Sequence, residues 1–450
     1  MPLLHGQAER YTTAPMGRRT GISGIGPVTA FGVGIEPLWS ALLEGRTAVD
    51  TIRQFDASNF GCPVGAELDD TFKVRDWVPK HYRKAIKVMC RDIELAVAGA
   101  MSSVQDAGLV TAATDKDAEP TLPPDRVGCQ IGAGLIASDI NELGQALITS
   151  VRDDGTFDMH HWGDQGMQHL TPLWLLKSLP NMLACHVTIV HACRGPSNTI
   201  TCWESSAALS LAESVRVIDR NAADACLSGG AESRLNPLAY YRQVRAGRLT
   251  TGARGADQAV LPFHADADGT VMGEGGGLLV VEAMDSIEAR GGRMYAEVLG
   301  CGSTQTIDDW TALGASAQSL GDAIALALGQ ADLQPDDIDA VVPFGSGIPA
   351  VDAAERGTLE QTFGTRAAEL PLVLLTPAVG NCCSGHGSVQ LAVAAKCIEQ
   401  GMLPARRGMG AVDGLDAGPC DAKAADLGAV LVLSSSQGGQ NTAVILGGAR

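Results

Sequence analysis

Hydrophobic and polar positions along the chain alternate in a way that predicts strands followed by helices. A short apolar run from Gly21 predicts a strand, and residues 37–44 predict the helix after it. Apolar residues recur at helical spacing over 82–107 and again over 138–151, on either side of a buried strand predicted at 126–134. Strand-rich segments with helices between them favour mostly parallel sheets covered by helices.

The same alternation continues to the end of the chain. The stretch NTIT (residues 198–201) predicts a strand that leads into a helix from Glu204 to about Asp219. The last segment, GAVLVLSSSQGGQNTAVILGG, predicts two strands joined by a turn. Between these stretches, further strands alternate with helices predicted at 314–330, 350–363 and 387–400.

This organisation predicts an α/β protein built from two similar halves. We expect a flexible N-terminal arm over 1–18, an N-terminal half over 19–262 and a C-terminal half over 263–450. A core of this size needs no disulfide bonds to be stable.

Composition and charge limit the cellular compartments and the classes of partner that are expected for the protein. The 450-residue chain is 45% hydrophobic and carries 12 cysteines without any CxxC pair, which favours a reducing cytoplasm. No uninterrupted apolar run is long enough to cross a bilayer, so a membrane is not an expected partner. The net charge of -18 argues against nucleic acid and anionic membrane surfaces as partners.

One segment offers residue types that bind metals. The stretch CHVTIVHAC holds Cys185, His186, His191 and Cys193. Its alternation is typical of an inner strand, on which neighbouring side chains point to opposite faces and do not converge on one ion. We therefore predict a buried strand here, and we expect neither a metal site nor a cofactor.

Several longer motifs occur together in a characteristic order. They are GIGPVTAFGVGIEPLWSALLEGRTAV, RVGCQIGAG, RGPSNTIT, LSGGAES, PFHADADGTVMGEGGGLLVVEAMDSIEARG and PFGSGIPAVDAAE. Through them the chain, from about residue 20 onward, resembles the elongating β-ketoacyl-acyl-carrier-protein synthases, or ketosynthases. This resemblance implies a thiolase-like fold with a duplicated five-layer αβαβα architecture, and an obligate dimer.

The resemblance also identifies where this chain departs from a condensing ketosynthase. The cysteine nucleophile of the family falls on Glu204, and its two histidines fall on Phe344 and Asn381. Claisen condensation needs an acylated thiolate and two imidazoles that drive decarboxylation and stabilise the enolate. A glutamate cannot hold a stable thioester, phenylalanine cannot donate a hydrogen bond, and asparagine cannot shuttle a proton. Ordinary condensing activity from this chain alone is therefore not expected.

Other positions of the implied pocket are changed as well. The lysine of the third motif, a glutamate on the following helix and the gating phenylalanine of the glycine-rich turn are all replaced. His386 lies five residues beyond Asn381, too far along the chain to take the place of the missing histidine. The replaced positions and the two glycines of the turn are Thr376, Gln390, Gln437, Gly438 and Gly439.

Two residues near the missing nucleophile admit both a functional and a structural interpretation. Cys202 precedes the predicted helix by two residues, so we expect it on the incoming strand or turn, outside the field of the helix N-terminus. It is either a nucleophile or a buried structural thiol. The helix N-terminus favours the charged form of Glu204, which opposes a role as general base, whereas burial would favour that role. Glu204 is therefore either a base or a carboxylate that caps the helix and fills the pocket.

A basic run stands out in this acidic chain. Lysines and arginines crowd residues 73–91, and the resemblance implies that a basic surface near this region meets an acidic acyl carrier protein. The alternative is a solvated helix face. The candidate docking residues are Lys80, Arg83, Lys84, Lys87 and Arg91.

A chain that keeps the ketosynthase scaffold but lacks the catalytic residues is similar to the chain-length factors. These proteins pair with an active ketosynthase and help to shape the tunnel that limits the growing chain. We expect a non-condensing, ketosynthase-like subunit of a polyketide or fatty-acid system, with an active ketosynthase and an acyl carrier protein as partners. One alternative is an acyltransferase, decarboxylase or hydrolase with altered chemistry centred on Glu204. The other is a homodimer that binds acyl chains without a synthase partner.

Overall fold

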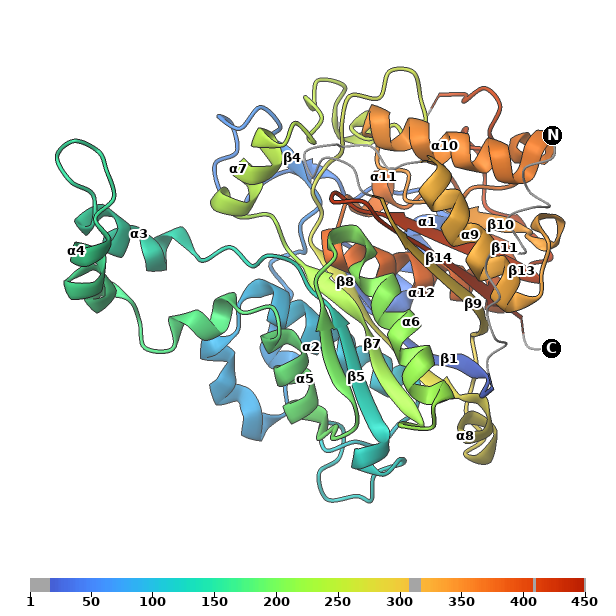
Figure 1. The fold of residues 1–450 in the computed structure, drawn as a ribbon, viewed down its shortest axis with the longest axis horizontal. Helices are drawn as coiled ribbons and strands as arrows, with labels where there is room; N and C mark the ends of the chain where they lie inside the picture. Colours follow the sequence, from blue (N-terminus) through green and yellow to red (C-terminus); the bar gives the residue numbers. More distant parts are fainter. Residues whose placement is uncertain (1–16, 307–316, 408–409, 449–450) are drawn as a thin grey trace.

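The computed structural model describes residues 17–306, 317–407 and 410–448, and a ten-stranded sheet forms its centre (Figure 1). Its strands are β1 (Thr20–Thr29), β2 (Gly32–Val33), β5 (Val127–Gly132), β6 (Ser197–Ile200), β7 (Ala225–Glu232), β8 (Gly275–Ala283), β9 (Ala296–Gln305), β10 (Ala340–Val342), β13 (Ala429–Ser435) and β14 (Gln440–Gly447). They follow the order β10-β13-β14-β9-β1-β8-β7-β5-β6, with β2 paired to β1. Two short pairs lie apart from this sheet: β3 (Asp50–Thr51) with β4 (Val64–Gly65), and β11 (Met402–Leu403) with β12 (Lys423–Ala424).

Parallel and antiparallel pairs are mixed in this sheet, so the prediction of mostly parallel sheets is wrong. β5 runs parallel to β6 and β7, and β10 runs parallel to β13. β8 lies antiparallel to β1 and β7, and β14 lies antiparallel to β13 and β9. A short turn between β13 and β14 reverses the chain direction, whereas parallel neighbours need a long crossover.

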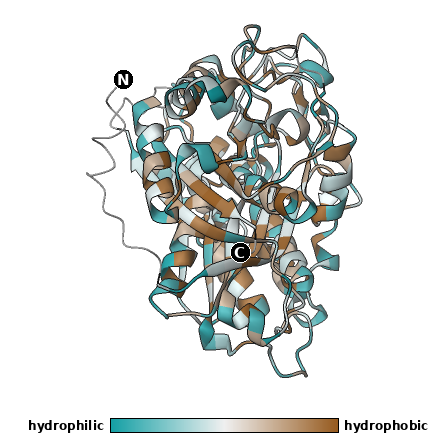
Figure 2. Ribbon diagram, turned by 90° about the vertical axis from the view of Figure 1, so that its right-hand side faces the viewer, coloured by the Kyte–Doolittle hydropathy of each residue, from teal (hydrophilic) through white to brown (hydrophobic). Residues whose placement is uncertain are grey.

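Two helices form the middle layer of the molecule. α6 (Ser206–Asp219) and α12 (His386–Gln400) contact each other and strands from both parts of the sheet order. α12 is buried along most of its length because small residues such as Gly387 and Ala392 let the neighbouring elements approach closely. Figure 2 shows hydrophobic residues concentrated on the central strands, with hydrophilic ones toward the outside.

The outer layers cover the two ends of the sheet. α2 (Arg91–Asp106) packs on β1, β7 and β8, and α5 (Met182–His191) packs on β5 and α2. α9 (Ala317–Ala331) packs on β9 and β14, with α10 (Pro349–Phe363) against it. The two ends of the sheet thus lie against the central helices and carry the outer helices, and this layering confirms the thiolase-like fold. The other α-helices are α1 (Ile35–Leu43), α3 (Ile140–Thr149), α4 (Met159–Asp164), α7 (Pro237–Arg245), α8 (Met284–Ala289) and α11 (Thr376–Val379).

A close approach of strands inside the sheet depends on glycine at Gly276. This residue has a φ of 132°, and an added Cβ would lie 2.1 Å from the carbonyl oxygen of Gly230. Because no other residue fits such a contact, the glycine-rich stretch GEGGG allows β8 to lie directly against β7 beneath α12.

Two local predictions from the sequence are wrong. The stretch from Met182 to His191 is the helix α5 rather than a strand, and its buried residues recur three or four positions apart against α2. The alternation of apolar and polar residues there is too short to distinguish the two structures. The helix predicted over 82–107 begins only at Arg91, because the preceding segment η3 (Lys80–Val88) is a 3₁₀ helix that ends in extended backbone at Met89.

A segment around α3 and α4 projects from the body of the molecule (Figure 1). It carries most of the large hydrophobic side chains that are exposed in the described part of the chain, and these include Leu135, Ile140, Ile148, Val151, Phe157, Met159, Met167, Leu173 and Leu175. Exposed apolar side chains gathered on one segment are typical of an interaction surface.

Of the predicted N-terminal arm, residues 1–16 lie outside the described residues. Arg18 is fixed by ion pairs with Asp224 and Asp285, both at 2.9 Å.

Strands that precede and strands that follow position 262/263 pair in one sheet, so the division of the chain into two halves at this point stays a prediction. None of the helices in the described ranges has the length and apolar character needed to span a bilayer.

Candidate functional site

Glu204 lies where the chain passes from β6 into α6. A single 3₁₀ turn, η7 (Trp203–Ser205), joins the strand to the helix, and it carries Glu204 wholly inside the protein. One carboxylate oxygen, Oε1, accepts hydrogen bonds from the buried guanidinium of Arg248 and from Nδ2 of Asn381, the latter at 3.1 Å. The position of the implied nucleophile is therefore occupied by a buried ion pair.

Arg248 determines the protonation state of Glu204. Burial acts to raise the pKa of this carboxyl group, but the charge and hydrogen bond of Arg248, together with Asn381, outweigh it, so the pKa of Glu204 lies below its ordinary value. The group is therefore a carboxylate at neutral pH and a weak proton acceptor. This favours the structural interpretation of Glu204 over that of a general base.

Phe344 and Asn381, the other two altered positions, lie in the same cluster. The ring of Phe344 is buried and packs edge-on against the imidazole of His386, with 5.5 Å between the ring centroids. The Oδ1 of Asn381 accepts the backbone N–H of Cys383 at 2.8 Å, so both ends of its amide are engaged. Neither residue supplies a proton donor or acceptor that can serve a substrate.

His386 lies five residues beyond the position of the missing histidine, yet it joins this cluster in the folded chain. It begins α12, and its Nε2 lies 3.5 Å from the hydroxyl of Thr376. Burial lowers the pKa of His386 to about 4, against the opposing effect of Glu204, so the imidazole is neutral at pH 7. Thr376 itself donates to the carbonyl oxygen of Phe344 at 3.0 Å.

Gln390 has a structural role. Its Nε2 donates to the carbonyl oxygens of Pro343 (2.8 Å) and Leu433 (3.0 Å), and its Oε1 accepts the hydroxyl of Ser434 at 3.0 Å. It thereby ties α12 to the ends of β10 and β13. A glutamine satisfies such a mixed set of donors and acceptors, which a carboxylate cannot do.

The glycine-rich turn between β13 and β14 lies beside the start of α6. Gly438 and Gly439 have φ angles of 101° and 88°, which only glycine adopts readily, and Gln437 precedes them. The hydroxyl of Ser205 donates to the carbonyl oxygen of Gln440 at 3.1 Å and connects the turn to η7. The structure therefore brings the turn and the altered nucleophile position together, as the resemblance implies.

The surroundings of Cys202 favour a structural thiol over a replacement nucleophile. It lies in the turn before η7, and its backbone N–H donates to the hydroxyl of Ser206 at 2.8 Å. Burial raises the pKa of its thiol, so the thiolate needed for acyl transfer is disfavoured. The interpretation as a structural thiol agrees with this geometry.

Trp203 and Arg234 complete the cluster and were not identified from the sequence. Trp203 has a φ of 49°, an unusual backbone conformation for a bulky residue. The guanidinium of Arg234 stacks on its ring at 4.2 Å from the centroid and pairs with Glu232 at 2.6 Å. Arg248 also lies over this ring, at 5.7 Å. Because Arg248 is 44 residues from Glu204 in sequence, no local motif could have revealed the pair.

Two other groups of candidate residues are placed apart from this cluster. The cysteines and histidines of the α5 segment do not converge, and no group of His, Cys, Asp or Glu within the described ranges could hold a metal ion. In the basic run, Arg91 is committed to the buried Glu274, at 2.8 Å, and is not part of a free docking face. The remaining candidates, Lys80, Arg83, Lys84 and Lys87, lie on η3.

Two models of known protein families match this chain. The model of the beta-ketoacyl synthase N-terminal domain matches residues 18–286, and that of the C-terminal domain matches residues 295–409. The chain belongs to the beta-ketoacyl synthase family.

Its relatives come from both fatty-acid and polyketide synthesis. The chain is 27% identical to 3-oxoacyl-[acyl-carrier-protein] synthase 2 of Synechocystis, over 86% of this chain and 87% of that protein. It is 28% identical to the actinorhodin polyketide putative beta-ketoacyl synthase 2 of Streptomyces coelicolor, over 94% of this chain and 97% of that protein.

Solved structures agree with this assignment. The ishigamide ketosynthase/chain length factor has a TM-score of 0.79 and 25% identity, over 96% of this chain and all (100%) of that one. A type II polyketide synthase acyl-carrier protein in complex with its ketosynthase, AntDE:AntF, has a TM-score of 0.82 with 20% identity, over 96% of this chain and 100% of that one, and supports the fold alone.

Proposed function

We propose that this ketosynthase-family chain is a non-condensing subunit, similar to a chain-length factor, that pairs with an active ketosynthase. The observation that carries the proposal is the buried pair of Glu204 and Arg248 at the position of the nucleophile. A carboxylate held by a guanidinium cannot form the thioester that condensation requires, and Phe344 and Asn381 supply no imidazole. The family models nevertheless match the chain over residues 18–286 and 295–409.

The proposed pairing surface consists of β6 and the projecting segment around α3 and α4. β6 is the last strand of the sheet order, and Ser197 and Asn198 on it are exposed. An open strand edge and a segment rich in exposed apolar side chains are both surfaces that a second chain would cover. The structural relative named as a ketosynthase/chain length factor supports a ketosynthase as that second chain.

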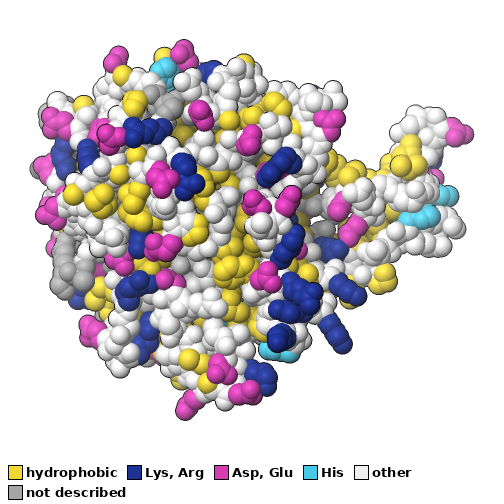
Figure 3. Space-filling model, turned by 180° about the vertical axis from the view of Figure 1, so that it is seen from behind, with side chains coloured by type: hydrophobic (Ala, Val, Ile, Leu, Met, Phe, Trp, Pro, Cys, Tyr) yellow, Lys and Arg dark blue, Asp and Glu magenta, His cyan; other side chains and the backbone are white. Residues whose placement is uncertain are grey.

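We further propose that η3 docks an acyl carrier protein. Lys80, Lys84 and Lys87 are exposed on η3, with Arg83 half-buried beside them. Figure 3 shows Lys and Arg side chains gathered beside the base of the projecting segment. A basic cluster on a chain with a net charge of -18 suits an acidic partner, and its binding should weaken as salt increases.

The proposed setting is the cytoplasm. All 12 cysteines of the chain are free thiols in the structure, and several are half-buried rather than enclosed in the core. A reducing compartment keeps such thiols from forming disulfides.

Native mass spectrometry of the tagged chain isolated from its own cells tests the pairing. One copy bound to one cysteine-bearing ketosynthase would support the proposal, and a self-paired dimer would contradict it. The purified pair and the chain alone are then given malonyl- and acyl-loaded carrier protein. Turnover by the chain alone that Glu204→Gln abolishes would instead support altered chemistry at Glu204.

A further inference from the structure

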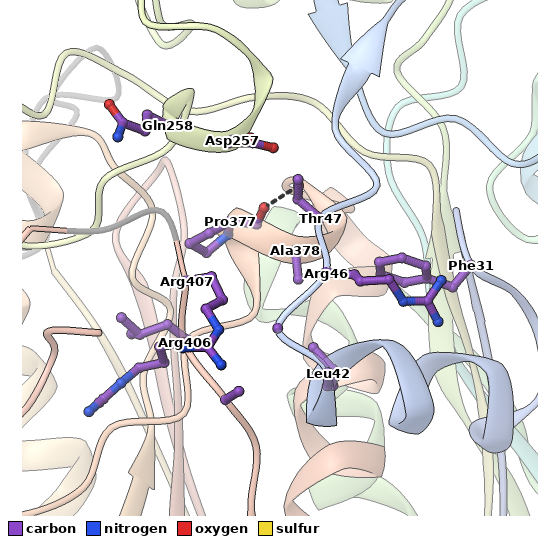
Figure 4. A pocket seen from close by; sticks show the side chains of 13 residues that line it. Phe31, Leu42, Arg46, Thr47, Asp257, Gln258, Pro377, Ala378, Arg406 and Arg407 are labelled. Carbon is purple, nitrogen blue, oxygen red and sulfur yellow. Dashed lines mark hydrogen bonds between the residues drawn. The ribbon is translucent and has the colours of Figure 1, made fainter. Parts of the chain in front are cut away.

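A solvent-accessible cavity of about 500 Å³ lies outside the Glu204 cluster (Figure 4). Its walls come from the chain just after α1, from residues 257–258, from the 374–378 stretch and from residues 405–407. The hydroxyl of Thr47 donates to the carbonyl oxygen of Pro377 at 2.8 Å and fixes one wall against another. With Phe31, these stretches make five separate segments that line the cavity.

Three arginines line this cavity on opposite sides. Figure 4 shows Arg46 beside the ring of Phe31 on one wall, and Arg406 and Arg407 on the other. The guanidinium of Arg46 lies 5.7 Å from the centroid of the Phe31 ring, which orients it by a cation–π contact. Asp257 is the single carboxylate among the lining residues, so the charge of the lining is positive even though the whole chain is acidic.

The backbone at Gly45 makes room for one of these arginines. Gly45 has a φ of 67°, and a Cβ added to it would lie 2.3 Å from Cγ of Arg407. The stem of Arg407 therefore lies directly on the glycine. Arg406, by contrast, is almost wholly buried. Its terminal nitrogens donate to the carbonyl oxygen of Leu372 and to the carboxylate of Asp416. Its Nε has no hydrogen-bond partner within the described residues.

The present partners of Arg46 and Arg407 are exchangeable. Arg46 contacts Glu44 through Nε at 2.7 Å, and Arg407 contacts Asp421 at 2.5 Å. The two carboxylate side chains are 59% and 82% exposed, and exposed ion pairs of this kind contribute little stability. A guanidinium has five donors, so each arginine can bind a further acceptor that enters the cavity.

We propose that this cavity binds a phosphoryl ester whose phosphoryl oxygens contact Arg46 on one wall and Arg407 on the other. Planar guanidinium forks match the oxygens of a phosphoryl group and bind them bidentately. Leu42 and Ala378 offer apolar contacts to the organic part of the ester, and Gln258 offers a hydrogen bond to it. None of these residues belongs to the Glu204 cluster, so the proposal does not depend on the proposed function.

Isothermal titration of the full-length protein, in the assembly in which it is isolated, tests this site with pyrophosphate, coenzyme A and sulfate as probes. We expect saturable binding of coenzyme A below about 10 mM, tighter than that of pyrophosphate, and roughly tenfold or greater weakening by Arg46→Gln or Arg407→Gln. Arg407→Lys keeps the charge but loses the fork, and an intermediate affinity is expected.

Arg220→Gln is the matched control. Arg220 is 54% exposed and paired with Glu213, whereas Arg46 is 53% exposed and paired with Glu44, so the two substitutions change the net charge equally at similar surface positions. Equal weakening by the control, or no saturable binding of any probe, would overturn the site. Equal affinity for pyrophosphate and coenzyme A would overturn the ester and assign the cavity to inorganic anions. Circular dichroism melts of each variant establish that it is folded.

Discussion

Replacing Arg248 by methionine should destabilise the protein strongly, because it leaves Glu204 buried without a counter-ion. The side chains of the two residues are 2% and 0% exposed, so water cannot solvate the remaining carboxylate. Removing one partner of a buried ion pair costs about 3–5 kcal/mol of unfolding free energy. The same change at Arg220, which is 54% exposed, should cost less than about 1 kcal/mol.

The double substitution Glu204→Gln with Arg248→Met separates the charge from the lost packing. It removes both charges and keeps an amide beside Asn381, so most of the loss should be recovered. The assay is urea unfolding at fixed protein concentration, followed by circular dichroism, because assembly also contributes to apparent stability. A loss below about 1 kcal/mol for Arg248→Met, or a double variant no more stable than the single one, would refute the reasoning.

The pH dependence gives an independent check on the same pair. In the wild type the folded pKa of Glu204 is lowered, so its contribution to stability is present above the unfolded pKa and is lost as the pH falls through the folded value. Without Arg248, burial raises the folded pKa above the unfolded value of about 4.3, and the sign reverses. The stability difference between wild type and Arg248→Met should therefore shrink as the pH is lowered from about 7 toward about 5.

Three further predictions concern activity, acid stability and assembly. Glu204→Cys should not restore condensation, because Arg248 would lose its counter-ion and no imidazole is regained; formation of a β-ketoacyl carrier protein by the chain alone would contradict this. Burial lowers the pKa of His191 to about 4, so the folded protein resists protonation of this imidazole. The free energy of unfolding therefore falls as the pH drops from about 6.5 to 4. His191→Leu should reduce this loss by up to about 3 kcal/mol, as measured by urea unfolding at both ends of the pH range. Ile148→Glu on α3 should weaken pairing, measured by native mass spectrometry, by tenfold or more, which is on the order of the loss of one buried apolar anchor. Tyr241→Glu on α7, which is also exposed, should not weaken it. Equal effects of the two substitutions would remove α3 from the proposed pairing surface.

The order of elements and the positions of the altered site could be predicted because both are local in sequence. The spacing from Gly195 to Glu204 indicates where the nucleophile turn lies, and the structure places Glu204 in such a turn before α6. The segment of α5 was misjudged because a buried helix and a buried strand share the same apolar residues over such a short length. Tertiary packing against α2 decides between them.

The counter-ion of Glu204 could not be predicted for a different reason. Arg248 lies after α7, in a segment without regular structure, and only the folded chain brings it to η7. Without that arginine, burial and the helix N-terminus oppose each other, so the sequence leaves the protonation state of Glu204 open. The ion pair decides it, and the ring of Trp203 beneath both Arg234 and Arg248 fixes the geometry.

The charged cluster also explains how the family scaffold persists without its nucleophile. A thiolate site needs an accessible cavity beside the helix start, whereas here the Glu204 carboxylate pairs with Arg248 at that position and the ring of Trp203 lies beside the guanidinium. Reversing the change therefore requires more than one substitution, because Glu204 and Arg248 are both buried and replacing either one alone leaves the charge of the other unpaired. Under the proposed function, such a chain retains the surfaces of a ketosynthase without condensing, and for this reason we expect the reacting thiolate in the partner subunit.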